Sequence, residues 1–163
     1  MICIDTTVLI DEFRARGSRD APVNRVLLTY GAEILIVPAI AAGEFLDGAA
    51  MVSGQRFHEC LEILRRRRVV SADLETAEHY GRIVALLRRN KDLAGRSQND
   101  LWIAATARCH GARVLTRNAT DFERIPDLEV LGYGESQREE KPRAHLKRAR
   151  VTAEPQRRSG PVS

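Results

Sequence analysis

The chain has 163 residues, of which 44% are hydrophobic and only 5% aromatic, and its formal net charge is +4 at pH 7. This length suits one domain with an aliphatic core and is too short for two domains of usual size. No apolar run reaches the roughly 18 residues that a membrane span needs, and the opening MICIDTTVLIDEF is acidic where a signal peptide is basic. We therefore expect a cytoplasmic protein that does not enter a membrane.

Apolar periodicity predicts strands and helices that alternate along most of the chain. Short apolar runs predict strands at Ile2–Ile4, Ile34–Val37, Arg113–Thr116 and Leu128–Leu131, with a further apolar pair at Val69–Val70. Helical spacing and end signals predict helices at Thr6–Arg14, Pro22–Tyr30, Pro38–Ala50, Gln55–Arg66, Asp73–Arg89 and Asn99–Cys109. This order predicts an α/β fold with a central parallel sheet covered by helices on both faces. The carboxyl ends of such strands share one edge, where ligands bind.

The end of the chain differs in composition from the rest. Residues 1–134 hold 18 Lys or Arg and 18 Asp or Glu, whereas residues 135–163 hold eight basic and four acidic side chains, which accounts for the whole excess charge. The last segment also has few large apolar side chains, so we predict a domain over 1–134 and a basic, disordered tail over 135–163. The tail either adds salt-dependent RNA affinity or is an inert extension.

The cysteines and histidines do not indicate a zinc site. Cys3, Cys60 and Cys109 are far apart in the chain, and each lies in an apolar stretch. The histidines are scattered and share no metal-ligand spacing with the cysteines. We therefore expect reduced thiols.

Four acidic residues stand where predicted strands end or a helix begins: Asp5, Glu44, Asp100 and Asp121. The first follows a strand directly, the second lies on the helix after the next strand, the third opens a helix, and the fourth follows another strand. We expect them to meet at the carboxyl edge of the sheet. Two carboxylates about 4 Å apart repel by about 4 kcal/mol at an effective dielectric near 20, so the group needs a counter-ion. Carboxylate oxygens favour Mg²⁺ or Mn²⁺, and such a site suits phosphodiester cleavage.

Each acid taken alone has another interpretation. Asp5 and Asp100 could cap the helices that follow them. Glu44 could be a partly exposed charge on a helix, and Asp121 could be a turn residue. The site is absent only if all four of these separate interpretations are true at once. We therefore favour a shared site of the four acids.

Four segments, in order along the chain, resemble the motifs of PIN domains, in particular of bacterial VapC-type toxins: DTTVLID (5–11), VPAIAAGEFLDGA (37–49), NDLWIAATA (99–107) and LTRNATDF (115–122). The resemblance implies a PIN-like three-layer α/β/α fold and an endoribonuclease whose catalytic acids are Asp5, Glu44, Asp100 and Asp121, with Asp5 and Asp100 as ligands of Mg²⁺ or Mn²⁺. It further implies that tRNA or ribosomal RNA is cut, which inhibits translation. A small cognate antitoxin is the implied partner, and the implied assembly is a homodimer.

Five further residues are candidates for substrate binding or for supporting the acids: Thr6, Thr116, Asn118, Arg96 and Arg117. The hydroxyl of Thr6 is predicted to orient Asp5 or a phosphate, or simply to sit in the first helical turn. Thr116 and Asn118 are polar companions in the fourth motif, and Asn118 either hydrogen-bonds an acid or forms a turn. Both arginines lie within four residues of a site acid, so we expect them to hold a phosphate.

Two other functions remain to be weighed. The first is a non-catalytic PIN-like module that binds RNA or a protein, and the intact set of four acids argues against it. The second is a phosphatase of the haloacid dehalogenase type, which needs a second Asp two residues after its nucleophile. Position 7 is Thr, which excludes that second function.

Overall fold

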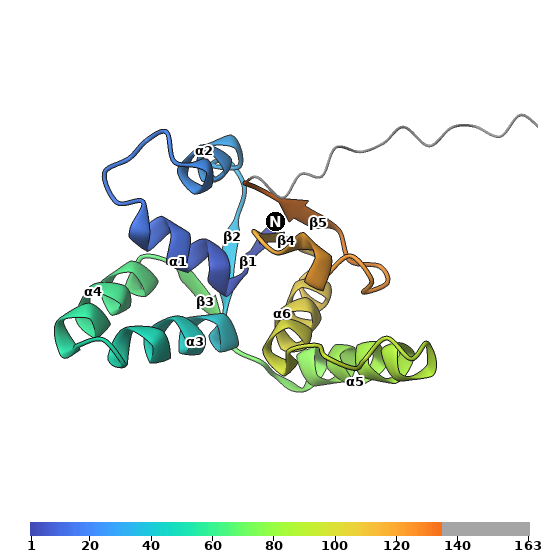
Figure 1. The fold of residues 1–163 in the computed structure, drawn as a ribbon. Coiled ribbons are helices and arrows are strands. Elements are labelled where there is room, and N and C mark those ends of the chain that lie inside the picture. Colours follow the sequence, from blue (N-terminus) through green and yellow to red (C-terminus); the bar gives the residue numbers. More distant parts are fainter. Residues whose placement is uncertain (135–163) are drawn as a thin grey trace, which may run out of the picture.

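The computed structural model describes residues 1–134, and the tail predicted for 135–163 lies outside the described residues. At its centre is a five-stranded parallel sheet in the order β3-β2-β1-β4-β5 (Figure 1). The strands are β1 (Ile2–Ile4), β2 (Leu35–Pro38), β3 (Arg68–Val70), β4 (Arg113–Thr116) and β5 (Val130–Gly132). The predicted α/β class with a parallel sheet is confirmed.

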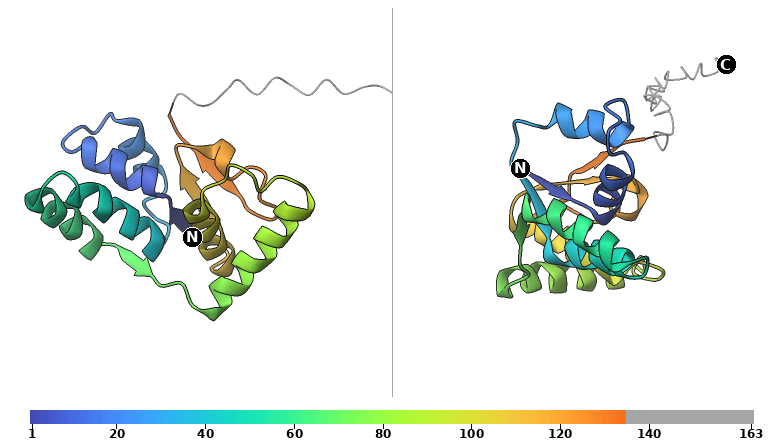
Figure 2. Two further views of the ribbon diagram at one scale, coloured as in Figure 1. Left: turned by 60° about the horizontal axis from the view of Figure 1, so that its bottom comes forward. Right: turned by 90° about the vertical axis from the view of Figure 1, so that its left-hand side faces the viewer.

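Helices connect the strands and pack in two groups. They are α1 (Thr6–Arg14), α2 (Pro22–Thr29), α3 (Ala39–Ala50), α4 (Gly54–Arg65), α5 (Leu74–Arg89), α6 (Gln98–Cys109) and the short 3-10 helix η1 (Ala119–Asp121). Figure 2 shows α1 to α4 on one side of the molecule and α5 beside α6 on the other. None of the helices within residues 1–134 is both long and apolar enough to cross a membrane.

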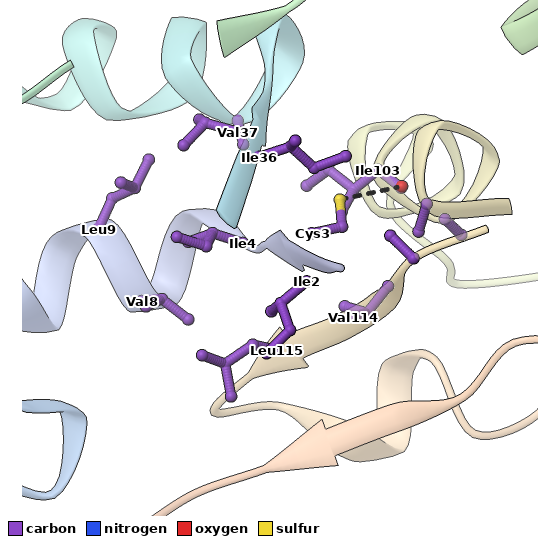
Figure 3. Close-up of a cluster of buried hydrophobic side chains, with 14 of the residues drawn as sticks. Ile2, Cys3, Ile4, Val8, Leu9, Ile36, Val37, Ile103, Val114 and Leu115 are labelled. Atoms are coloured by element: carbon purple, nitrogen blue, oxygen red, sulfur yellow. Dashed lines mark hydrogen bonds between the residues drawn. The ribbon is translucent and has the colours of Figure 1, made fainter. Parts of the chain in front are cut away.

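The central strand β1 is buried on both faces, which explains its unbroken apolar run. Cys3 faces α6, where its thiol lies 3.9 Å from the carbonyl oxygen of Ile103 (Figure 3). Because side chains alternate along a strand, Ile2 and Ile4 face the other side, where α1 packs. The thiol of Cys3 is fully buried, which raises its pKa, and all three cysteines are free.

Three predicted boundaries were wrong. Pro38 was expected to be the first residue of a helix, but it ends β2 and occupies the cap position before α3. The last strand was expected from Leu128, but Asp127 adopts a positive φ of 56°, and this turn delays β5 until Val130. Helix α6 was expected from Asn99 but begins at Gln98, because the side chain of Ser97 caps it by accepting from the backbone N–H of Asn99.

Candidate active site

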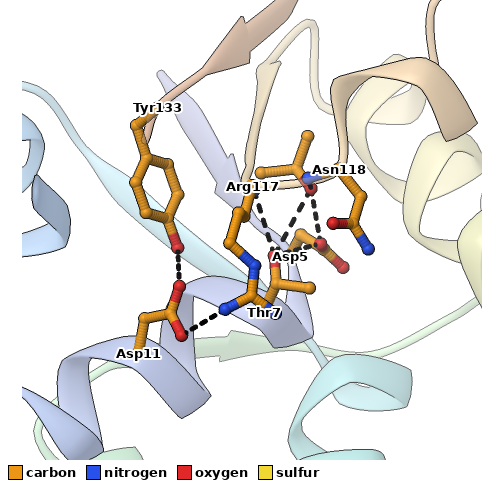
Figure 4. A network of polar contacts seen from close by, with 7 residues as sticks. Asp5, Thr7, Asp11, Arg117, Asn118 and Tyr133 are labelled. Carbon is orange, nitrogen blue, oxygen red and sulfur yellow. Dashed lines mark hydrogen bonds and ion pairs between the residues drawn. The ribbon is translucent and has the colours of Figure 1, made fainter. Parts of the chain in front are cut away.

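Asp5 lies at the carboxyl end of β1 and is only 3% exposed. Its Oδ1 accepts a hydrogen bond from the backbone N–H of Thr6 (2.7 Å), and its Oδ2 accepts from the hydroxyls of Thr7 (2.6 Å) and Thr116 (2.7 Å; Figure 4). The pairing of β1 with β4 brings Thr116 beside it. A buried carboxylate is costly unless it is hydrogen-bonded, so these three donors explain how Asp5 tolerates burial. Asp5 therefore caps α1 and belongs to the site at the same time.

Glu44 reaches the same edge from α3 and is partly buried. Its two oxygens accept one hydrogen bond each, Oε2 from the hydroxyl of Thr6 and Oε1 from the side-chain amide of Asn99, both at 2.6 Å. The prediction for Thr6 was therefore wrong in its partner: the hydroxyl orients Glu44, while only the backbone of Thr6 contacts Asp5. Glu44 is thus tied to α1 and to α6, which fixes its position between them.

Asp100 and Asp121 complete the group of four carboxylates. Asp100 lies in the first turn of α6 and does not cap it, and Asp121 ends η1. Within residues 1–134, neither side chain accepts a hydrogen bond. Burial, followed by the nearby charges of Asp5, Asp121 and Glu44, raises the pKa of Asp100 to about 6 against an opposing effect of Arg96. Asp100 therefore lies close enough to the other three acids for their charges to raise its pKa.

A second polar network joins α1 to the loop that follows β4 (Figure 4). Asp11 accepts a hydrogen bond from the guanidinium of Arg117 at 2.6 Å and another from the hydroxyl of Tyr133 at 3.0 Å. The backbone N–H of Arg117 donates to the hydroxyl of Thr7 (3.1 Å), which in turn donates to Asp5. Burial and the contact with Asp11 raise the pKa of Tyr133. Arg117 therefore supports the loop after β4, and its charge is paired with Asp11.

The other two candidates lie near the site in roles that differ from those expected. The guanidinium of Arg96 donates to the backbone oxygens of Asp92 (2.8 Å) and Asp121, which ties the loop before α6 to η1. Asn118 is exposed, and its backbone N–H donates to the hydroxyl of Thr116 at 2.9 Å. Its side-chain amide makes no hydrogen bond to an acid among the described residues. Of the two alternatives predicted for Asn118 the turn is the one observed, since its backbone oxygen accepts from the N–H of Asp121 at 3.1 Å.

Two hollows adjoin the carboxylates from different sides. The apolar hollow, of about 190 Å³, has Glu44 at its margin and is lined mainly by apolar side chains, together with two cations, Arg14 and Arg56. The larger apolar side chains are Ile10, Phe13, Phe45 and Val52. The polar hollow, of about 630 Å³, includes Asp100 and Asp121 and is lined by the loop before α6 and by η1 with its following turn. The site therefore lies between an apolar surface and a charged one.

Comparison with known proteins identifies the family. Residues 2–128 match the PIN domain. The chain is 37% identical over 140 residues to Ribonuclease VapC11 of Mycobacterium tuberculosis, an alignment that covers 82% of this chain and 99% of that protein. The chain belongs to the VapC family of PIN-domain proteins. It is also 30% identical over 135 residues to Ribonuclease VapC1 of Rickettsia felis, covering 80% of this chain and 94% of that one. A chain of a toxin-antitoxin complex from Klebsiella pneumoniae has the same fold, with a TM-score of 0.62 and 26% identity over 80% of this chain and 96% of that chain.

The donor set of this VapC-family protein fits a hard divalent ion. Asp100 and Asp121 carry charge that no hydrogen bond within residues 1–134 offsets, and the raised pKa of Asp100 reports that excess. In the same residues, no three acidic, His or Cys side chains are close enough to enclose an ion by themselves. Mg²⁺ usually binds through one or two carboxylates and keeps several waters, so a pair of these acids suffices. A set of oxygen donors favours Mg²⁺ or Mn²⁺ over zinc.

Three residues that contribute to the VapC-family site were not predicted from the sequence. Thr7 and Asn99 each donate directly to a site acid, and Asp11 holds the arginine beside Thr7. Asn99 could have been found, because it precedes Asp100 within the third motif and an amide is a natural donor to a carboxylate. The contact of Thr7 with Asp5 spans two residues within the first motif. That of Asp11 with Arg117 depends on how the loop after β4 packs against α1, so local sequence carries no signal for it.

Proposed function

We propose that this chain is a Mg²⁺- or Mn²⁺-dependent endoribonuclease, the toxin of a toxin–antitoxin pair. The observation that carries the proposal is the convergence of four carboxylates around Asp100, whose pKa is raised to about 6 by burial and then by the other three. Its relatives in the VapC family are named as ribonucleases, which supports hydrolysis of RNA. A non-catalytic module would have no need to keep this repulsive group intact.

The side chains divide the work of hydrolysis. Asp5 and Asp100 are the proposed metal ligands. A bound divalent ion supplies positive charge that lowers the pKa of the attacking water and offsets the charge of the phosphate. Glu44 has lone pairs left after accepting one hydrogen bond at each oxygen, so it can orient a water and accept its proton. Asp121, at the end of η1, is the fourth proposed catalytic acid.

A direct test compares RNA cutting by matched variants. The wild type should cut single-stranded or looped RNA with Mg²⁺ or Mn²⁺ and should be silent with EDTA. Asp100→Asn should reduce the rate more than about 100-fold, since removing even an outer support of a metal site costs about 10–100-fold. Asp47→Asn, which changes an exposed acid on α3, should leave the rate unchanged. Equal rates for all three proteins would overturn the proposal.

We infer that the natural substrate is tRNA or ribosomal RNA and that cutting inhibits translation in the cytoplasm. The support for this inference is the resemblance of the four motifs and the family assignment. Mapping of RNA ends after brief induction, with Asp5→Asn as the inactive control, should give a few discrete new ends in the wild type. Ends spread evenly over messenger RNA would contradict the inference. The homodimer stays a prediction of the resemblance.

We further infer that a small antitoxin covers the apolar hollow. The Klebsiella pneumoniae neighbour is described as part of a toxin-antitoxin complex, and this hollow is the apolar surface that adjoins Glu44. Phe13 and Phe45 meet there edge to face with ring centroids 6.2 Å apart, which offers an aromatic floor to an apolar helix face. Phe45→Ala is unsuitable as a test because Phe45 is 5% exposed, whereas Val52→Asp, at a position 66% exposed, should weaken the complex and leave cutting intact.

A further inference from the structure

The polar hollow is lined mainly by charged side chains. It contains three cations, Lys91, Arg96 and Arg124, together with four acids, Asp92, Asp100, Asp121 and Glu123. Two of these acids are members of the carboxylate group itself. The cations therefore line the same hollow as two acids of the proposed site of cutting.

The three cations differ in how far their charge is already used. Arg96 donates to two backbone oxygens and so connects the loop before α6 to η1. Its role is therefore structural. Arg124 has a side chain that is 71% exposed and lies 3.4 Å from Asp92 in an exposed ion pair, and such pairs contribute little and exchange readily. Lys91 is exposed and makes no ion pair within residues 1–134. Lys91 and Arg124 are therefore the cations that a ligand can recruit.

The backbone at Lys91 favours a fixed presentation of its side chain. Lys91 follows α5 with a positive φ of 59°, a conformation that a non-glycine residue rarely adopts and that ends the helix sharply. Its backbone N–H donates to the oxygen of Arg88 at 3.2 Å, and that of Asp92 donates to Leu87 at 2.9 Å, so the turn closes on the helix. The turn therefore places Lys91 on the margin of the polar hollow.

We propose that the RNA backbone leaves the cut site across the polar hollow and that Lys91 and Arg124 bind phosphates next to the one that is cut. This inference rests on the proposed ribonuclease function and names the path of its substrate. RNA needs a cationic track. The apolar hollow also has two cations, Arg14 and Arg56, but its other lining is mostly apolar and Arg56 already lies over the ring of Phe13, whereas the polar hollow contains two of the site acids. The acids of the polar hollow exceed its cations by one, so a divalent ion at Asp100 reverses its net charge and RNA binding there depends on that ion.

The test measures RNA binding and its salt dependence separately from cutting. The probe is a 5′-labelled single-stranded RNA with phosphorothioate linkages, followed by fluorescence anisotropy with Mg²⁺ at several salt concentrations. Lys91→Gln and Arg124→Gln should each weaken binding roughly three- to tenfold and make the slope of log K against log salt shallower by about 0.7, the value for one phosphate contact in a single strand. Arg124→Lys should restore most of the affinity because it keeps the charge.

Arg82→Gln is the matched control, because Arg82 is also paired with an acid, on α5, and its side chain is 67% exposed. It should bind RNA as the wild type does. If Lys91→Gln and Arg124→Gln behave like Arg82→Gln while unmodified RNA is still cut, the path is wrong and the ribonuclease stands. If the wild type neither binds nor cuts RNA with Mg²⁺ or Mn²⁺, the proposed function fails and the path fails with it.

Discussion

The four carboxylates of the site form two pairs that the protein supports in different ways. Asp5 and Glu44 together accept five hydrogen bonds from backbone, hydroxyl and amide donors. Asp100 and Asp121 accept none within residues 1–134, although burial and the other acids raise the pKa of Asp100 to about 6. One pair is thus satisfied by the fold, and the other carries charge that the fold leaves uncompensated.

This difference separates two tasks of a metal site. Hydrogen-bonded carboxylates keep their place whether or not an ion is bound, so Asp5 and Glu44 form the rigid part of the site. The repulsion at Asp100 is relieved only when a cation or a proton arrives. If Asp100 binds the proposed ion, the fold holds Asp5 and Glu44 in place by itself, while Asp100 depends on that ion.

Among changes that leave all four carboxylates intact, the largest loss of activity should come from removing a hydrogen bond to Asp5 or Glu44. Thr116→Val removes one of the three donors to Asp5, and loss of such support typically costs about 10–100-fold in metal affinity or activity. RNA cutting and Mn²⁺ affinity should fall together, while circular dichroism stays native. Thr106→Val is the control, because Thr106 is equally buried and bonds only within α6. Equal losses in both variants would show that the contact to Asp5 has no special importance.

The two pairs should also respond with opposite sign when a charge is removed in EDTA. Asp5→Asn leaves hydroxyl donors without an acceptor and should lower the free energy of unfolding by about 1–3 kcal/mol. Asp100→Asn relieves repulsion and should raise it by about 1 kcal/mol, after allowance for the partial solvent exposure of Asp100. Urea unfolding measures both values. A loss of stability in both variants would mean that Asp100 is held by contacts as Asp5 is.

A smaller effect is expected farther from the acids. Tyr133→Phe removes the hydroxyl that donates to Asp11 and should lower the free energy of unfolding by about 1 kcal/mol, with little change in cutting because Arg117 still binds Asp11. Tyr30→Phe is the control, since that hydroxyl makes no hydrogen bond within residues 1–134. A large loss of activity in Tyr133→Phe would extend the rigid part of the site to β5.

The smallest expected effect is the dependence of protein stability on pH in the absence of metal. Asp100 has a pKa of about 6 in the folded protein and about 3.9 when unfolded, so the folded state binds the extra proton between these values. The stability of the wild type relative to Asp100→Asn should therefore be greatest below about pH 4 and fall as the pH rises to about 6, by about 1 kcal/mol in all. Parallel pH profiles for the two proteins would contradict a raised pKa at this position.

The sequence predicts the fold and the four acids because both depend on local patterns. Apolar runs such as Ile2–Ile4 mark buried strands, and alternation with helices dictates a parallel sheet with one functional edge. Helix ends were harder to predict: Asp100 was a possible cap of α6, but Ser97 caps this helix by accepting from the backbone N–H of Asn99. The start of β5 depends on the positive φ of Asp127, which sequence alone does not reveal.

The supports of the acids could not be predicted in the same way. The hydroxyl of Thr6 turns to Glu44, 38 positions away in the chain, and that of Thr116 turns to Asp5, 111 positions away. These partners are chosen by how α3 and β4 pack against β1 and α1, which no local pattern encodes. The same packing gives Arg117 to Asp11 and leaves Lys91 and Arg124 as the cations beside the site.

A calorimetric titration of Mn²⁺ into the protein at pH 7 tests the central claim most directly. If the four carboxylates form a divalent metal site, the wild type and Asp47→Asn will bind Mn²⁺ alike, and Asp100→Asn will lose most of that binding. Equal uptake by all three proteins, or no uptake by the wild type, would contradict a metal site at this edge of the sheet.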